Sequence, residues 1–189
     1  MAAPTDRAAA VRAALRTLVA RNGFHGASMG AVAREAGVAT GTAYTHYASK
    51  DALVLAAYCE TKAALAAAAT AGLDERARAD ERFHALWLSC YRYLKANPEH
   101  ALFLLQVEHS PYRTPAHTAA LANENDPLLA QVAAPDLAAR LLPLPLDVLY
   151  ELALNPAVRL AAGDTELTQT QLDEIANACW RAITRPEES

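Results

Sequence analysis

The segment Ser28–Leu53, SMGAVAREAGVATGTAYTHYASKDAL, holds the pattern that decides the fold. Ser28 is a favourable N-cap for a helix whose apolar residues recur every three or four positions, and Gly37 ends that helix. A second, short helix is predicted over 40–47, and a third, long helix from Lys50 to about Ala71. Two short helices joined by a tight turn form a helix-turn-helix, whose second helix lies in the major groove of DNA.

Helical spacing of apolar residues continues through almost all of the 189-residue chain, and no stretch alternates long enough at period two to predict a strand. A helix is predicted from about Asp6 to Asn22, ended by Gly23 in a left-handed conformation. Beyond Ala71, further helices are predicted over about 80–96, 98–108, a short segment after the loop at 109, 127–141, 146–162 with a kink at Pro156, and 168–184. The chain is therefore predicted to be all-α, with about nine helices.

Hydroxyl, aromatic and basic side chains crowd into the short helix over 40–47 and the residues just after it. Threonine can hydrogen-bond to base edges or phosphates and can offer its methyl group to thymine. Tyr44, His46 and Lys50 suit phosphate contacts, because they bring donors and a positive charge beside a helix N-terminus whose free N–H groups favour anions. Tyr44 and Tyr47 are also open to interpretation as packing residues, which we favour for Tyr47.

The charge of the chain is divided unevenly along its length. Residues 1–50 hold six Lys or Arg and two acidic residues, a net charge of +4, whereas the other 139 residues hold 11 basic and 19 acidic residues, a net charge of −8. Such asymmetry is expected where a small module meets a polyanion. A chance excess of basic side chains on a solvated surface is the alternative interpretation.

The segment GFHGASMGAVAREAGVATGTAYTHYASKDAL, within about Val11–Leu55, resembles the N-terminal domain of the tetracycline-repressor (TetR) family of transcriptional regulators. The resemblance implies that the threonines read bases or phosphates, that the tyrosine, histidine and lysine bind phosphates, and that a glycine lets the backbone approach DNA closely. The implied DNA-binding residues are Ser28, Thr40, Gly41, Thr42, Tyr44, Thr45, His46 and Lys50. Ala43 departs from the family pattern, which commonly has leucine there, and this puts the packing beneath the helix in doubt.

By the same resemblance, residues 1–50 form a helix-turn-helix DNA-binding domain and residues 51–189 a larger helical domain for ligand binding and dimerisation. The last two predicted helices are strongly amphipathic, and a stripe of that kind is ordinarily core. In the family, however, the last two helices pair with those of a second subunit, so a homodimer is predicted. The predicted interface residues are Leu149, Leu172, Ile175, Ala176, Cys179, Trp180 and Ile183.

Aromatic residues and histidines of the larger domain are candidates for lining a pocket that takes a small apolar effector. The predicted pocket residues are Trp87, Tyr91, Phe103, His109, Tyr112 and Tyr150. An aromatic stripe at helical spacing can equally be plain packing. His100, Glu108, His109 and His117 could bind a metal, but no histidines are spaced at i, i+4, so neither a metal nor a cofactor is expected.

Several other classes of protein are disfavoured by the sequence. No nucleophile elbow, zinc-protease motif or phosphate-binding loop is present, so no enzymatic activity is predicted. Neither a membrane-spanning run nor a signal peptide is recognised, so a cytoplasmic location without membrane association is expected. A helical small-molecule-binding protein that does not bind DNA is the main alternative, against which the charge division and the polar 40–47 helix argue.

Overall fold

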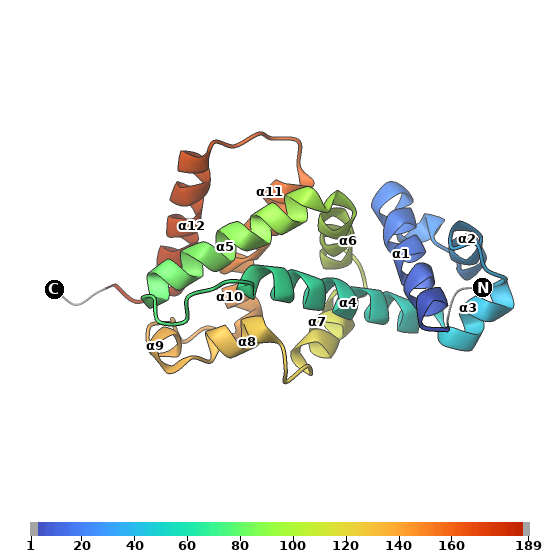
Figure 1. Cartoon of the computed structure of the whole chain (residues 1–189), viewed down its shortest axis with the longest axis horizontal. Coiled ribbons are helices and arrows are strands. Elements are labelled where there is room, and N and C mark those ends of the chain that lie inside the picture. Colours follow the sequence, from blue (N-terminus) through green and yellow to red (C-terminus); the bar gives the residue numbers. More distant parts are fainter. Residues whose placement is uncertain (1–3, 187–189) are drawn as a thin grey trace. The chain divides into compact units, whose positions relative to one another are not determined.

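A computed structural model describes residues 4–186, in which every helix can be followed in Figure 1. The elements are α1 (Pro4–Asn22), the short 3-10 helix η1 (Phe24–Gly26), α2 (Met29–Glu35), α3 (Thr40–His46), α4 (Lys50–Thr70), α5 (Ala79–Ala96), α6 (Pro98–Glu108), α7 (Arg113–Leu121), α8 (Pro127–Val132), α9 (Pro135–Ala138), α10 (Leu146–Ala153), α11 (Asn155–Ala162) and α12 (Gln169–Ile183). The predicted all-α fold is confirmed, with one isolated β-bridge and no strand among the described residues.

Two stretches predicted as single helices are each divided in two. The predicted helix over 127–141 is α8 followed by α9, because Pro135 cannot donate the backbone hydrogen bond that would continue α8. The predicted helix over 146–162 is α10 followed by α11, and Pro156 lies in the first turn of α11, where proline is tolerated. The described residues form twelve α-helices, against the predicted nine or so, and these two divisions account for two of the additional helices.

The chain divides into two compact units. The first comprises Met1–Lys62 and Glu99–Asn123, and the second comprises Ala63–Pro98 and Glu124–Ser189. Helix α4 contributes its first part to one unit and its last part to the other. The packing units thus differ in their bounds from the predicted functional domains, which meet at residue 50.

In the first unit, α1 packs against η1, α2 and α3, and α2 packs against α3. Each of these helices buries the apolar face that its spacing predicts. The buried side chains include Val11, Leu15, Val19, Met29, Val32, Ala33 and Ala43, together with Leu53, Val54 and Ala57 of α4. Helices α2 and α3, which form the helix-turn-helix, are therefore held on a continuous core.

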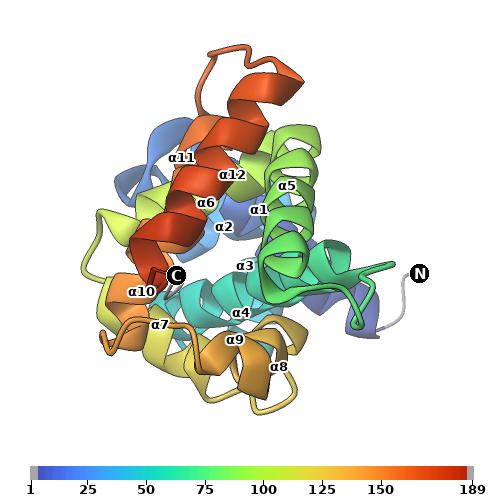
Figure 2. The same ribbon diagram turned by 90° about the vertical axis from the view of Figure 1, so that its left-hand side faces the viewer.

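In the second unit, α5 packs against both α11 and α12, and α10 packs against α11 and α12 (Figure 2). The predicted face of α5 is buried, and its side chains are Phe83, Leu86, Trp87, Cys90, Tyr91 and Leu94. Facing residues of α12 are also buried, namely Leu172, Ala176, Cys179 and Ile183. This stripe of α12 is therefore part of the core of its own chain.

The end of α12 is tied to the segment that follows α9 by an isolated antiparallel bridge between Leu141 and Thr184. The Leu142 N–H donates to the Ile183 carbonyl at 2.8 Å, and the Arg185 N–H donates to the Arg140 carbonyl at 2.9 Å. The Arg140 guanidinium lies over the Trp180 ring, 5.4 Å from its centroid. Ile183 and Arg185 are thus fixed by backbone hydrogen bonds.

Helix α4 is the one helix of the described residues that is long and apolar enough to cross a membrane. Its most apolar 18-residue window is 44% buried inside the protein, and the core helix of a soluble protein satisfies the same criteria of length and composition. Leu53, Val54, Ala57 and Tyr58 are fully buried along it. We interpret α4 as a core helix.

Candidate nucleic-acid interface

The helix-turn-helix is built from α2 and α3, and its geometry follows from a few local residues. The Ser28 hydroxyl accepts a hydrogen bond from the Ala31 N–H at 3.2 Å, so it caps α2 as predicted. Gly37 adopts a φ of 67°, a left-handed conformation that favours glycine, and thereby ends α2. The Val38 N–H then donates to the Ala33 carbonyl at 2.9 Å, which closes the turn before α3 begins at Thr40.

Helix α3 has one buried position and a broad exposed face. Ala43 is fully buried against the core, so the small side chain at this position is enclosed in spite of the departure from the family pattern. Tyr44 is 51% exposed, which argues against a packing role for it. Of the eight predicted DNA-binding residues, five are exposed and three are half-buried; the exposed ones are Ser28, Thr40, Gly41, Tyr44 and Thr45, and the half-buried ones are Thr42, His46 and Lys50.

The Thr45 hydroxyl donates to the Gly41 carbonyl at 2.9 Å within α3. This hydrogen bond uses its single proton and leaves its oxygen lone pairs and its methyl group for other contacts. In the major groove such an oxygen can accept from the amino group of adenine or cytosine, and the methyl group can contact thymine. As long as this bond is kept, Thr45 can read a base only by accepting a hydrogen bond from it or by contacting it with its methyl group.

Lys50 lies at the first residue of α4, where its ammonium group donates to the Phe24 carbonyl and sits 5.9 Å from the centroid of the Phe24 ring. An ammonium group has three donors, so two remain for a phosphate. The Phe24 ring in turn packs against Tyr112, with ring centroids 4.8 Å apart. The Tyr112 hydroxyl donates to Asp51 at 2.9 Å, and burial together with this bond raises the pKa of Tyr112 to about 12.

Three of the six basic side chains in the first 50 residues form ion pairs within the chain. Arg12 and Arg16 both bind Glu60 of α4, and Arg21 lies within 4 Å of two carboxylates, Glu35 at 3.7 Å and Glu99 at 3.9 Å. Arg34 is exposed and has no ion pair among the described residues. The net charge counted from the sequence therefore overstates the charge available to DNA.

Two family models match the chain. The model described as bacterial regulatory proteins of the tetR family matches residues 11–57, which contain the whole helix-turn-helix. The model described as the tetracyclin repressor-like C-terminal domain matches residues 79–184, more than half of the chain. The chain belongs to the TetR family.

Similar proteins agree with this TetR assignment over nearly the full length. An uncharacterised HTH-type transcriptional regulator from Haemophilus influenzae is 29% identical over 186 residues, which is 96% of this chain and 97% of the relative. The crystal structure of the H. influenzae TetR-family regulator HI0893 has a TM-score of 0.76 at 28% identity and covers 96% and 98% of the two chains. A TetR-family structure from Shewanella shares the fold, with a TM-score of 0.78 at 24% identity over 95% and 99%.

A TetR-family chain with this domain pair is a DNA-binding transcriptional regulator. The alternative of a helical ligand-binding protein without a DNA-binding function is thereby disfavoured, since the matched N-terminal model is that of the DNA-binding domain. Dimerisation is likewise implied by the TetR family. Within the described residues, no group of three or more His, Cys, Asp or Glu side chains is placed to hold a metal ion.

The residues predicted to line the effector pocket of this TetR protein are divided between the two units. Phe103, His109 and Tyr112 belong to the first unit, whereas Trp87, Tyr91 and Tyr150 belong to the second. Trp87 is fully buried, stacks on Tyr91 with ring centroids 6.1 Å apart, and donates from its ring nitrogen to the Ala153 carbonyl at 2.9 Å. These contacts are those of core packing, and a pocket-lining role for the set stays a prediction.

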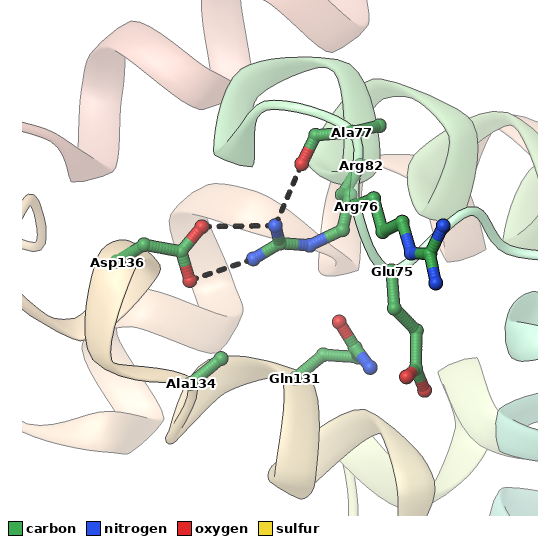
Figure 3. Close-up of a pocket in the computed structure, with 7 residues that line it drawn as sticks. All are labelled: Glu75, Arg76, Ala77, Arg82, Gln131, Ala134 and Asp136. Carbon is green, nitrogen blue, oxygen red and sulfur yellow. Dashed lines mark hydrogen bonds and ion pairs between the residues drawn. The ribbon is translucent and has the colours of Figure 1, made fainter.

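An open pocket of about 380 Å³ lies in the second unit, where sequence reasoning had predicted no site. One lining residue is Arg82, which is only 6% exposed and forms two 2.9 Å contacts with the Asp136 carboxylate and one of 2.8 Å with the Ala77 carbonyl (Figure 3). The other lining residues are Glu75, Arg76, Gln131 and Ala134. No local pattern could have revealed this pocket, because Arg82 and Asp136 are 54 residues apart, and its polar lining differs from that of the predicted apolar pocket.

Proposed function

We propose that this TetR-family regulator is a ligand-responsive repressor that binds a palindromic operator as a homodimer in the cytoplasm and has no catalytic role. The observation that carries the proposal is the exposed polar face of α3, which presents Thr40, Tyr44 and Thr45 while Ala43 anchors the helix to the core. Such a face suits base edges and phosphates together. One head reads few base pairs, so a two-fold pair of heads is needed for selectivity.

The surface proposed for dimerisation lies on α10 and the residues before it. Of the predicted interface residues, Leu149, Leu172, Ala176, Cys179 and Ile183 are already buried within the chain. Ile175 and Trp180 are half-buried, and Trp180 packs on Phe83 with ring centroids 5.3 Å apart. By contrast, four apolar side chains are each 37–39% exposed, namely Leu144, Leu146, Val148 and Leu152. A second copy of the chain is the occupant that the TetR family implies, so we assign the interface to this apolar surface.

The proposed division of labour follows the two matched models. Residues 1–50 would hold DNA, and residues 51–189 would bind a small, largely apolar effector and the second subunit. Helix α4 supports communication between these functions, because it begins at the proposed phosphate contact Lys50 and belongs to both packing units. Effector binding can release DNA only if the effector has unequal affinities for the two states of the protein.

Selection from a pool of random duplexes with the full-length protein tests the proposal directly. We expect enrichment of two inverted half-sites whose centres are separated by a whole number of helical turns, about 10 base pairs each. Enrichment of a single half-site would contradict the proposed dimeric operator, and recovery of no preferred sequence would contradict operator binding. A small molecule that weakens binding to the selected duplex would identify the effector, and the duplex must then weaken effector binding by the same factor.

Replacing Lys50 with alanine is expected to weaken binding to the selected operator and to a scrambled duplex by the same factor. Phosphate contacts supply affinity and salt dependence but carry no base information, so the slope of log affinity against log salt should fall by about 1 for each head. Fluorescence anisotropy at several salt concentrations measures both quantities. Lys62→Ala, on the same helix, serves as a matched control and should leave the slope unchanged.

Thr45→Ala should behave in the opposite way to Lys50→Ala. It is expected to change the preference at one or two base pairs by about 1–3 kcal/mol without altering the salt slope. A change of base preference in Lys50→Ala, or a uniform loss in Thr45→Ala, would reverse the roles assigned to these two residues.

Gly41→Ala is expected to stabilise the free protein and to weaken its binding to DNA. A Cβ atom at position 41 would meet no other atom within 4 Å, and its backbone conformation suits any residue. Alanine should therefore raise the free energy of unfolding by about 0.4–1 kcal/mol through the unfolded chain. On DNA, the added methyl group would stand between the α3 backbone and the duplex.

Urea unfolding and anisotropy with the selected duplex, performed on the same preparation of Gly41→Ala, measure the two effects together. Unfolding cannot explain weaker binding by a more stable variant, so the pair of results is its own control. Unchanged DNA affinity in Gly41→Ala would contradict the proposal that the α3 backbone approaches DNA closely.

A further inference from the structure

Glu60 lies in the middle of α4 and is shared by two arginines of α1. One carboxylate oxygen accepts from Arg12 at 2.6 Å, and the other accepts from Arg16. Burial raises the pKa of the Glu60 carboxyl, but the hydrogen bonds from the two arginines outweigh it and leave that pKa below its ordinary value. Glu60 is therefore an ionised carboxylate that joins α4 to α1.

Arg12 continues the connection from Glu60 to the end of the DNA-reading helix. Its second terminal nitrogen donates to the Tyr47 hydroxyl at 2.5 Å, and Tyr47 is the residue that ends α3. The Tyr47 hydroxyl lies 3.4 Å from the Ala8 carbonyl of α1, to which it donates. Three helices, α1, α4 and the end of α3, thus meet in one polar network, and all of it lies in the first unit.

The Arg12 guanidinium is oriented toward two acceptors, the Glu60 carboxylate and the Tyr47 hydroxyl. Its Nε donor is buried and has no hydrogen-bond partner, although its two terminal nitrogens are both engaged. A planar guanidinium can reach two acceptors on different elements at once, which a lysine ammonium at the end of a flexible chain cannot do with the same fixed geometry. Arg12 is therefore held by its two acceptors, while its Nε–H is left without a partner.

We propose that Glu60, Arg12 and Tyr47 form a linkage that positions the DNA-reading helix α3 on the long helix α4. They are positioning residues and make no contact with DNA themselves. This goes beyond the TetR assignment, which gives no role to any of the three, and it rests on DNA binding as the function. Through this linkage, a movement of α4 would displace the end of α3 by way of direct polar contacts.

A purely electrostatic role for Glu60 makes the opposite prediction. If Glu60 only neutralised Arg12 and Arg16, Glu60→Gln would release positive charge, strengthen binding to every duplex and steepen the salt dependence. The linkage instead predicts weaker binding to the operator and little change with a scrambled duplex, since a misplaced α3 loses base contacts but keeps its nonspecific attraction. The ratio of the two affinities therefore distinguishes the roles.

The test uses the full-length protein with the selected operator and a scrambled duplex of the same composition. Glu60→Gln, Tyr47→Phe and Arg12→Lys are each expected to lower the ratio of operator affinity to scrambled affinity about tenfold. The double variant Glu60→Gln/Tyr47→Phe should lose no more than the larger single loss, because the two residues act through one arginine. Glu35→Gln, which disrupts the exposed contact with Arg21, is the matched control and should leave the ratio unchanged.

Hydrogen exchange provides a second readout that needs no operator. Amides of residues 40–47 should exchange faster in all three single variants, while those of α5 and α12 keep the parental rates, at a temperature where circular dichroism shows every variant folded. An unchanged affinity ratio, a rise in affinity for both duplexes, or parental exchange across 40–47 would each overturn the linkage.

Discussion

The double variant Val148→Asp/Leu152→Asp is expected to be monomeric at micromolar concentration and to bind the operator about 10²- to 10⁴-fold more weakly than the parent. Both side chains are more than a third exposed in the single chain, at 37% and 39%, and lie one helical turn apart on α10. Placing two charges in an apolar interface leaves them without partners when the subunits meet. The affinity for the operator falls because each monomer binds its half-site alone, without a second DNA-binding domain attached to it.

Light scattering measures the assembly state of this variant, and anisotropy measures its affinity for DNA. Leu121→Asp is the matched control, because Leu121 is also an exposed leucine, on α7, outside the proposed interface. It should remain dimeric with parental affinity. Persistence of the dimer in Val148→Asp/Leu152→Asp would move the interface away from α10, and dissociation of Leu121→Asp would show that charge on any apolar surface has the same effect.

Trp87→Ala is expected to lower the free energy of unfolding by about 3–5 kcal/mol. The Trp87 ring is fully buried on α5 and stacks on Tyr91, so its removal leaves a large apolar cavity. The Ala153 carbonyl also loses its donor at 2.9 Å, which adds the cost of a buried acceptor without a partner. Urea unfolding at fixed protein concentration measures the change.

Two companion variants separate the contributions to the Trp87 effect. Trp87→Phe keeps an aromatic ring but removes the N–H donor, so it should cost less than Trp87→Ala. Trp180→Ala removes the other tryptophan of the chain, which is only half-buried between Phe83 and Arg140, and it should also cost less. If Trp87→Ala cost no more than Trp180→Ala, Trp87 would line an open cavity, as the sequence predicts, and would not be core.

Features that depend on local spacing were predictable from the sequence. The Ser28 cap, the turn at Gly37 and the buried face of α5 each follow from residues a few positions apart, and the structure has all three. The break between α8 and α9 at Pro135 was not predicted, because the apolar spacing typical of a helix continues through the proline. The misleading signal at this position was therefore periodicity carried across a residue that cannot donate a backbone hydrogen bond.

Features that depend on distant partners were not predictable. The apolar stripe of α12 has the same spacing whether it packs within its own chain or against a second one, so the sequence alone could not assign Leu172 or Cys179 to the core. Glu60 is a single acidic residue in an alanine-rich helix, and its partners Arg12 and Arg16 lie 48 and 44 positions earlier. Only the tertiary arrangement shows that these charges neutralise each other and are withheld from DNA.

The bridge between Leu141 and Thr184 bears on how the C-terminus can be modified. Since the Ile183 carbonyl and the Arg185 N–H are both hydrogen-bonded to the segment before α10, residues 183–185 are part of the folded unit. A fluorescent protein or purification tag fused after Arg185 leaves these bonds in place, whereas a chain shortened before Ile183 removes both of them. Any reporter of the subunit state is therefore best joined beyond residue 185, where the label reports on α12 without loosening its end.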